Sequence, residues 1–167
     1  TNPENVIFTF NATHALNIAI RSIANKGDKV VISGYEHNSV TRVLNHIGAR
    51  IEVASSPLFE PLSAIDAFSE KLNGAKLAVC NHVSNVFGYI LPIKEIAMLC
   101  HQKGVPLIID ASQSAGVLPI DFRDLDTAYV AMPGHKGLFG PQGTGGLALA
   151  NDIVVPPLKV GGSGTHT

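Results

Sequence analysis

The sequence is poor in charge, and neither sign dominates. Only 15% of its 167 residues are charged, and 12 Lys and Arg against 13 Asp and Glu leave a net charge of −1. Nucleic acids and anionic membranes attract clusters of basic residues, and no basic run occurs here. We therefore expect neither nucleic acid nor a membrane among the partners. The 46% of hydrophobic residues predicts instead a chain that buries a sizeable core.

Cysteine and long apolar runs are also scarce. The two cysteines, Cys80 and Cys100, lie in apolar surroundings, and neither they nor the seven histidines have the spacing of metal ligands. We expect two buried free thiols, no metal site and a reducing, cytoplasmic location. No apolar run is long enough to cross a bilayer, and the first residues do not have the pattern of a signal peptide.

Short apolar runs alternate with amphipathic segments along the chain. The runs predict strands over residues 6–10, 30–33, 50–54, 77–83, 106–109, 127–132 and 146–150. Apolar residues at helical spacing predict helices over residues 15–23, 35–47, 61–72 and 93–101. This order indicates an α/β fold with three layers, in which helices cover both faces of a mainly parallel seven-stranded sheet.

Two strands of this sheet have a predicted place or direction. The strand over residues 50–54 carries charges and is expected to be peripheral. The last two strands are joined by a loop too short for a right-handed crossover, so we expect the last strand to be antiparallel.

Polar side chains follow five of the expected strands, each at the carboxyl end. They are Asn11 and Thr13 after the first strand, His37 after the second, Asn85 after the fourth, Asp110 and Gln113 after the fifth, and His135 and Lys136 after the sixth. Open α/β sheets bind ligands at that edge, so these residues are expected to meet in space. Asn11 or Thr13 is also a natural N-cap, and a strand that runs into a capped helix leaves backbone N–H groups ready for an anion such as phosphate.

Each of these residues has a simpler interpretation. Asp110 is equally explained as the cap of a following helix, His37 as a polar residue at a helix N-terminus, and Asn85 as a turn residue. Lys136, taken alone, is a solvated loop lysine. Set among small residues at the end of a buried strand, however, it is expected to be desolvated and to lose its proton readily, which makes its amine a nucleophile for a carbonyl.

Together these groups indicate one ligand. A backbone ready for phosphate, a carboxylate, an aromatic histidine and a lysine at one sheet edge suit a molecule with a phosphate, a basic ring nitrogen and an aldehyde. Pyridoxal phosphate has all three.

Five motifs make the sequence resemble the class V aminotransferase family of fold type I pyridoxal-phosphate enzymes, and within it the cysteine desulfurase-like group. The motifs span nearly the whole chain in the expected order, over residues 11–17, 36–39, 83–88, 110–116 and 134–141. The resemblance implies a homodimeric enzyme and names Lys136 and His37 as its catalytic residues.

The resemblance also implies how the cofactor is held. Lys136 forms a Schiff base with the cofactor aldehyde and moves protons at the substrate α-carbon, and Asp110 keeps the pyridine nitrogen protonated. His37 stacks on the ring face. The remaining roles fall to Gln113 at the phenolic oxygen, Asn85 near the substrate, and Ala12, Thr13 and His135 at the phosphate.

The sequence departs from the family pattern at several points. Pro133 stands where the family often has a phosphate-binding serine, and His14 replaces the usual glutamate of the first motif. Neither Cys80 nor Cys100 fits the nucleophilic loop cysteine of a desulfurase. We therefore expect residues 1–155 to be a cofactor-binding large domain. Residues 156–167 are expected to be a loop that leads towards a further C-terminal part and reaches a neighbouring subunit.

Three functions remain open at this point. The first is desulfuration of cysteine to alanine with an enzyme-bound persulfide, passed on to a sulfur acceptor protein. The second is an aminotransferase or lyase that acts on another amino acid. The third is an inactive or non-catalytic domain that binds a phosphorylated ligand. Activity of these 167 residues alone is expected to be weak or absent.

Overall fold

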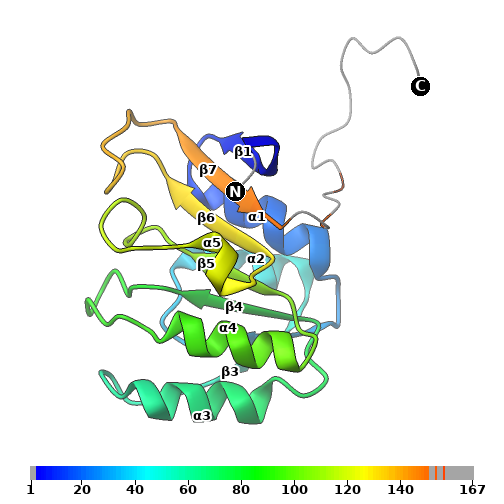
Figure 1. Ribbon diagram of the computed structural model, residues 1–167. Helices are drawn as coiled ribbons and strands as arrows, with labels where there is room; N and C mark the ends of the chain where they lie inside the picture. The colour runs from blue at the N-terminus through cyan, green and yellow to red at the C-terminus, as the bar shows by residue number, and fades with distance from the viewer. Residues whose placement is uncertain (1–2, 151–152, 154–155, 157–167) are drawn as a thin grey trace, which may run out of the picture.

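A mixed sheet of seven strands forms the centre of the molecule (Figure 1). The computed structural model describes residues 3–150, 153 and 156. The strands are β1 (Val6–Thr9), β2 (Lys29–Ile32), β3 (Arg50–Val53), β4 (Leu77–Asn81), β5 (Leu107–Asp110), β6 (Tyr129–Pro133) and β7 (Gly145–Leu149). The helices are α1 (Ala12–Ile23), α2 (Asn38–Ile47), α3 (Pro61–Lys71), α4 (Ile93–Gln102) and α5 (Phe122–Leu125), after a short 3-10 turn at Pro3–Asn5.

The strand order is β1-β7-β6-β5-β4-β2-β3. Strands β6, β5, β4, β2 and β3 are parallel neighbours, whereas β7 lies antiparallel between β1 and β6. The predictions of a mainly parallel sheet and an antiparallel last strand are confirmed. The charged strand β3 is at the edge, as expected, while β4 lies between two parallel neighbours with all five residues buried.

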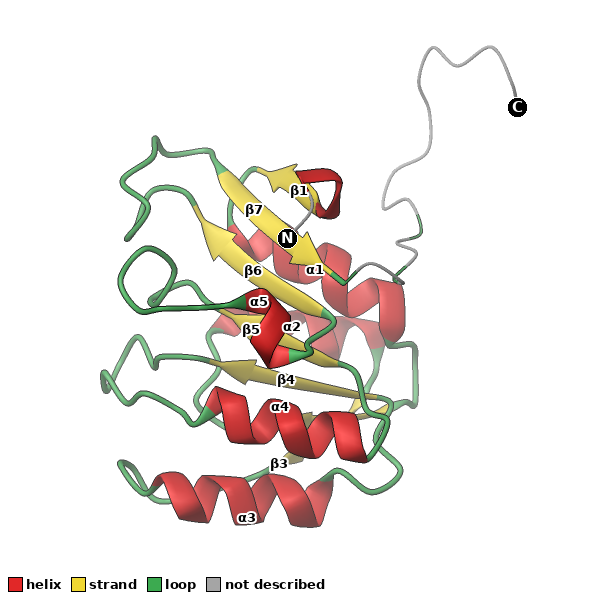
Figure 2. Cartoon of the chain, in the orientation of Figure 1, coloured by secondary structure: helices red, strands yellow, loops and turns green. Residues whose placement is uncertain are grey.

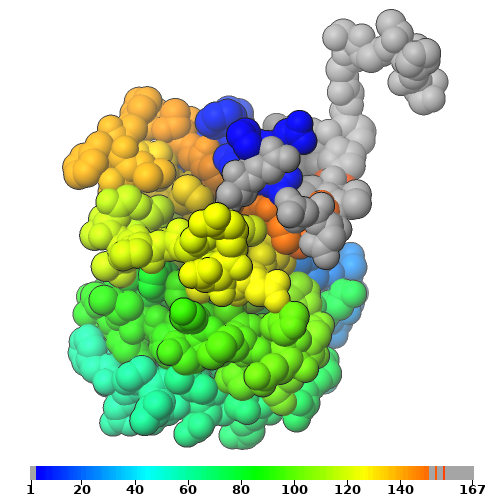
Figure 3. Space-filling model, in the orientation of Figure 1, coloured from blue at the N-terminus to red at the C-terminus, as the bar shows by residue number. Residues whose placement is uncertain are grey.

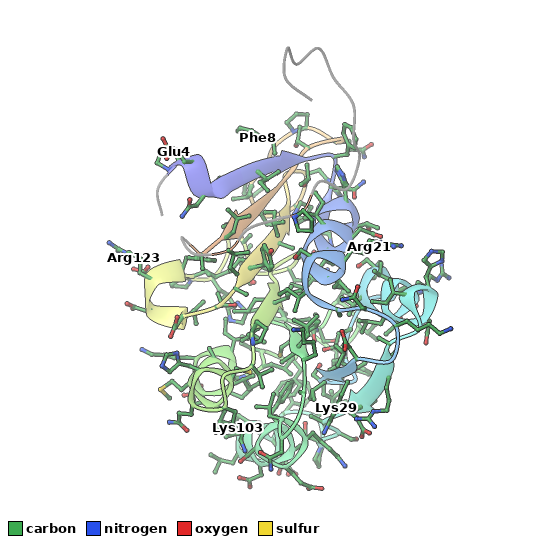
Figure 4. All side chains as sticks on the ribbon, turned by 90° about the vertical axis from the view of Figure 1, so that its right-hand side faces the viewer. Glu4, Phe8, Arg21, Lys29, Lys103 and Arg123 are labelled. Carbon is green, nitrogen blue, oxygen red and sulfur yellow. The ribbon has the colours of Figure 1, made fainter. Side chains whose placement is uncertain are left out.

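Helices cover both faces of the sheet, which confirms the predicted three layers. One core cluster contains buried residues of α1 and α2, such as Leu16 and Leu44, and the other contains residues of α3 and α4, such as Phe68 and Ile96. Figure 1 shows α3, α4 and α5 in front of the sheet and α1 and α2 behind it. Figure 4 shows side chains filling the space between sheet and helices, while Glu4 and Arg123 lie at the outer margin.

Most element boundaries differ from the sequence prediction by one to three residues, and one helix was not predicted. Helix α2 begins at Asn38 rather than at residue 35, because the Glu36 carboxylate folds back onto the backbone of Ser33 and Gly34 and holds this segment as a turn. Helix α5 was not predicted. Its four residues are too few for a periodic apolar pattern, and Asp121 caps it by accepting a hydrogen bond from the Arg123 N–H at 3.0 Å.

The parallel strands bring their following loops to one end of the sheet. Figure 2 shows the loops after β4, β5 and β6 side by side at the arrowhead end. Within the part of the chain that the structure describes, no helix is long and apolar enough to cross a membrane.

Candidate active site

A pocket of about 190 Å³ lies where the loops after β1, β2, β4, β5 and β6 converge. All eight predicted site residues line it: Ala12, Thr13, His37, Asn85, Asp110, Gln113, His135 and Lys136. The topology thus brings together residues that are separated by up to 124 positions. The predicted roles of these residues are a separate matter, because no bound ligand is present.

The N-terminus of α1 forms the end of the pocket that suits an anion. Asn11 is the N-cap, and its side chain accepts a hydrogen bond from the His14 N–H at 2.9 Å. The N–H groups of Ala12 and Thr13 belong to the first turn and have no partner inside the helix, so they add partial positive charge at this end. Among the residues that line the pocket, Asp110 alone carries a carboxylate.

Asp110 ends β5, next to Asn81 of β4 in the parallel register. The residue is only 4% exposed, and its Oδ1 accepts a hydrogen bond from the Ser112 N–H at 2.9 Å. No helix follows β5 directly, so the interpretation of Asp110 as the cap of a following helix is wrong; the carboxylate instead holds the turn that begins at Ser112. The bond at Oδ1 fixes the carboxylate and leaves Oδ2 for a group in the pocket.

The turn before α2 presents His37. The Glu36 carboxylate accepts hydrogen bonds from the N–H groups of Ser33 at 2.9 Å and Gly34 at 2.8 Å, and from the Ser33 hydroxyl. Burial raises the pKa of Glu36, although these donors act in the opposite direction. His37 is the N-cap of α2, so its capping role and its place in the pocket are both realised.

The lysine loop, residues 134–144, is closed by its own backbone. The Gly134 N–H donates to the Thr144 carbonyl at 2.7 Å, and the Gly140 N–H donates to the Gly134 carbonyl at 2.8 Å. Its middle packs on the loop after β5, where a Cβ on Gly137 would lie 2.4 Å from the Ala115 carbonyl oxygen. Figure 3 shows the two loops in contact at one side of the molecule. This contact sets the position of Lys136.

Lys136 is exposed, so the expectation of a desolvated lysine is wrong for the chain as described. The small residues around it explain the difference. They let two backbones approach each other, but small side chains add little cover over an amine.

Asn85 occupies a turn between β4 and α4, as its simpler interpretation predicts. The turn is held by the Ser84 N–H, which donates to the Tyr89 carbonyl at 2.9 Å, and by the Gly88 N–H, which donates to the Ser84 carbonyl at 2.9 Å. Asn85 is exposed and also lines the pocket.

Five further residues line the pocket and were not predicted as site residues: Ser39, Asn81, Val83, Ser112 and Pro133. Asn11, which was expected at this edge of the sheet and as an N-cap, lines the pocket as well. For Asn81 the sequence offered a signal, because a polar residue ends an otherwise apolar buried strand. Its Oδ1 accepts a hydrogen bond from the Ser33 hydroxyl at 3.1 Å. Ser39 and Ser112 lie inside motifs that were singled out, but only the structure shows what they contact.

Both cysteines are buried free thiols inside regular elements, away from the pocket lining. Burial raises the pKa of Cys80, with the Glu36 charge as a smaller contribution, and raises the pKa of Cys100 to about 12. Neither thiol is an accessible nucleophile. Among the described residues no group of three or more His, Cys, Asp or Glu is placed to hold a metal ion. Of the predicted loop at residues 156–167, only residue 156 is among the described residues.

Comparison with known proteins gives a consistent picture. A probable cysteine desulfurase of Pyrococcus abyssi is 33% identical over 96% of this chain, and the match covers 42% of that protein. The chain therefore spans well under half the length of this curated relative.

Two solved structures resemble the fold closely. The apo cysteine desulfurase of Thermococcus onnurineus NA1 matches with a TM-score of 0.79 and 30% identity, over 89% of this chain and 39% of that one. The cystine C–S lyase C-DES, in complex with its reaction product cysteine persulfide, matches with a TM-score of 0.87 and 26% identity, over 96% of this chain and 46% of that one. The aminotransferase class-V family model matches residues 1–167, the whole chain, which therefore belongs to the aminotransferase class-V family.

Proposed function

We propose that the chain is the cofactor-binding part of a pyridoxal-phosphate-dependent enzyme that removes sulfur from cysteine. One observation carries the proposal: a lysine amine, a buried carboxylate and the free N–H groups of a helix N-terminus line one pocket. Pyridoxal phosphate, when bound, supplies an aldehyde that combines with amines and a ring that withdraws electrons from the α-carbon of an amino acid.

The donor set of the pocket fits this cofactor. The uncapped N–H groups of Ala12 and Thr13 suit a phosphate, and His135 lines the pocket as a further donor. Asp110 suits a protonated ring nitrogen, because its buried carboxylate keeps one oxygen free of backbone bonds. Pro133 cannot donate a hydrogen bond, so phosphate binding rests on α1 and His135.

Each remaining residue has a proposed task. Lys136 Nζ holds the cofactor and then moves a proton at the substrate α-carbon. His37 lies against the ring face, Gln113 donates to the phenolic oxygen, and Asn85 contacts the substrate side.

Cysteine is the proposed substrate, because the Pyrococcus and Thermococcus relatives are named as cysteine desulfurases. Desulfuration through a persulfide on the enzyme needs a reactive thiol, and the two buried cysteines do not provide one. The similarity to a cystine C–S lyase favours a second candidate: cleavage of a C–S bond in cystine, with the persulfide released as product.

The wider setting is proposed on the same grounds. Residues 1–155 would be the large domain, and residues 156–167 would lead on towards a further part. The enzyme would act as a homodimer and hand sulfur to an acceptor protein. Its two free, buried thiols suit a reducing cytoplasm.

Cofactor capture tests the proposal. The chain is mixed with pyridoxal phosphate, its absorbance is recorded before and after borohydride, and the labelled residue is located by peptide mass spectrometry. We expect attachment at Lys136 that is lost in Lys136→Ala and retained in Lys94→Ala, which changes an exposed lysine outside the pocket. Reducible attachment that survives Lys136→Ala would overturn the assignment. Binding without attachment would favour a non-catalytic phosphate site.

The reaction is tested in a protein that extends this chain to the length of its relatives. Alanine released from cysteine supports desulfuration, whereas cysteine persulfide released from cystine supports the lyase. Asp110→Asn should abolish either reaction while attachment at Lys136 persists, because the ring nitrogen then loses its ionised partner. Near-normal turnover by Asp110→Asn would contradict the role of this carboxylate.

A further inference from the structure

His37 is both a pocket residue and the N-cap of α2. Its Nδ1 lies 3.1 Å from the Ser39 backbone N and 2.9 Å from the Ser39 hydroxyl oxygen. Side-chain caps are usually oxygen acceptors, so an imidazole nitrogen in this place must supply a lone pair. The cap therefore constrains the chemistry of the ring.

A backbone N–H can only donate a hydrogen bond. Nδ1 must then be unprotonated, and the Ser39 hydroxyl, which shares the same nitrogen, is a second donor to it. In a neutral imidazole one nitrogen carries the proton and the other accepts, so the proton of His37 is on Nε2. Protonation of Nδ1 would remove the bond from the Ser39 backbone N–H, so the first turn of α2 would lose its side-chain cap, and it would make the Ser39 hydroxyl an acceptor.

Resting on the proposed function, we infer that the α2 cap fixes His37 in the Nε2–H form, so that this side chain meets the bound substrate as a hydrogen-bond donor and not as a base. Ser39 is the positioning residue, through its backbone N–H and its hydroxyl. The group that faces Nε2 in the complex is an acceptor, such as an anionic oxygen or sulfur. The ring orientation is fixed by the same two bonds, which suits a ring that lies flat against another.

Nitrogen NMR of the full chain tests the inference without cofactor. With ¹⁵N-labelled protein at neutral pH, we expect an unprotonated Nδ1 and a protonated Nε2 for His37. We also expect a through-hydrogen-bond coupling between the Ser39 amide nitrogen and Nδ1. His37→Asn assigns the signals among the seven histidines, because Asn is a strong N-cap and preserves the helix. A protonated Nδ1, or no coupling to Ser39, would overturn the inference.

Two further measurements separate the contribution of the Ser39 hydroxyl from that of its backbone N–H and test the donor role of Nε2. Ser39→Ala keeps the backbone donor, so the coupling should persist while the Nδ1 shift moves towards that of a free imidazole; in Ser39→Thr it should return to the wild-type value. An unchanged shift in Ser39→Ala would remove the hydroxyl from the inference. When pyridoxal phosphate is added, Nε2 should stay protonated and exchange its proton more slowly. Loss of that proton would show a base and refute the donor role. Failure of the cofactor to bind would instead contradict the proposed function. The tautomer of His37 would still be known, because it is measured without cofactor.

Discussion

The contact between the lysine loop and the loop after β5 can be tested at Gly137. A Cβ at this position would lie 2.4 Å from the Ala115 carbonyl oxygen and 2.6 Å from a methyl group of Val117, whereas ordinary contacts begin at 3.4 Å. The Val117 side chain is exposed and can turn away, but the carbonyl belongs to a loop that Asp110 and the β5–β6 pairing hold. Gly137→Ala therefore forces the two loops apart by about 1 Å.

The expected magnitude follows from this displacement. Overpacking of a close contact costs about 1–3 kcal/mol of unfolding free energy. Because Lys136 precedes the changed residue, its amine moves relative to Asp110, and a misplacement of about 1 Å can reduce a reaction rate by roughly a hundredfold. Attachment of pyridoxal phosphate to Lys136 should thus slow far more than the loss of stability explains.

Urea unfolding measures the loss of unfolding free energy. The rate of borohydride-reducible attachment of pyridoxal phosphate measures the displacement of the Lys136 amine. Gly146→Ala is the matched control, because its Cβ would make an ordinary contact of 3.6 Å with the Met132 side chain in a neighbouring strand. If Gly137→Ala matched this control in both measurements, the loop contact would not position the lysine and the reasoning would be refuted.

Two other predictions concern buried titratable groups. Glu36→Gln should lower the unfolding free energy by about 1–3 kcal/mol. The amide NH₂ would face one of the two backbone N–H groups whose hydrogen bonds the carboxylate now accepts. Burial raises the pKa of Glu36 in the folded chain above its ordinary value near 4.5. The stability that Glu36 contributes is therefore complete at a pH below 4.5, and it is lost as the pH rises through the pKa of the folded chain. Urea unfolding should therefore show the advantage of wild type over Glu36→Gln shrinking from acid to neutral pH; a constant difference would contradict this. Cys80 and Cys100 should resist a thiol reagent until urea unfolds the chain, because burial raises both pKa values, that of Cys100 to about 12. Rapid labelling of the native chain would count against their burial.

The layout of the pocket explains why a short α/β domain can gather so many functional groups. Each strand contributes the residues just beyond its carboxyl end, and the backbone there is held by local bonds such as those at Asn11, Asp110 and Glu36. The backbone that carries the side chains lining the pocket is therefore held in place without a ligand, which lowers the cost of ordering this segment on binding.

The sequence alone determined the layers, the strand sequence and the direction of β7, because these follow from apolar periodicity and connection length. It also determined which residues gather at the pocket, since polar residues that follow parallel strands must meet at one edge. It gave no signal for α5, whose single turn is too short to show a period.

Only the tertiary structure decided the contacts between segments distant in sequence. It placed β7 between β1 and β6, brought Gly137 against Ala115, and left Lys136 exposed where the sequence indicated desolvation. It also showed that His37 caps α2 through Nδ1. Composition and spacing describe which groups are near one another along the chain, whereas exposure, close backbone contact and the choice of hydrogen-bond partner depend on what the rest of the fold places beside them.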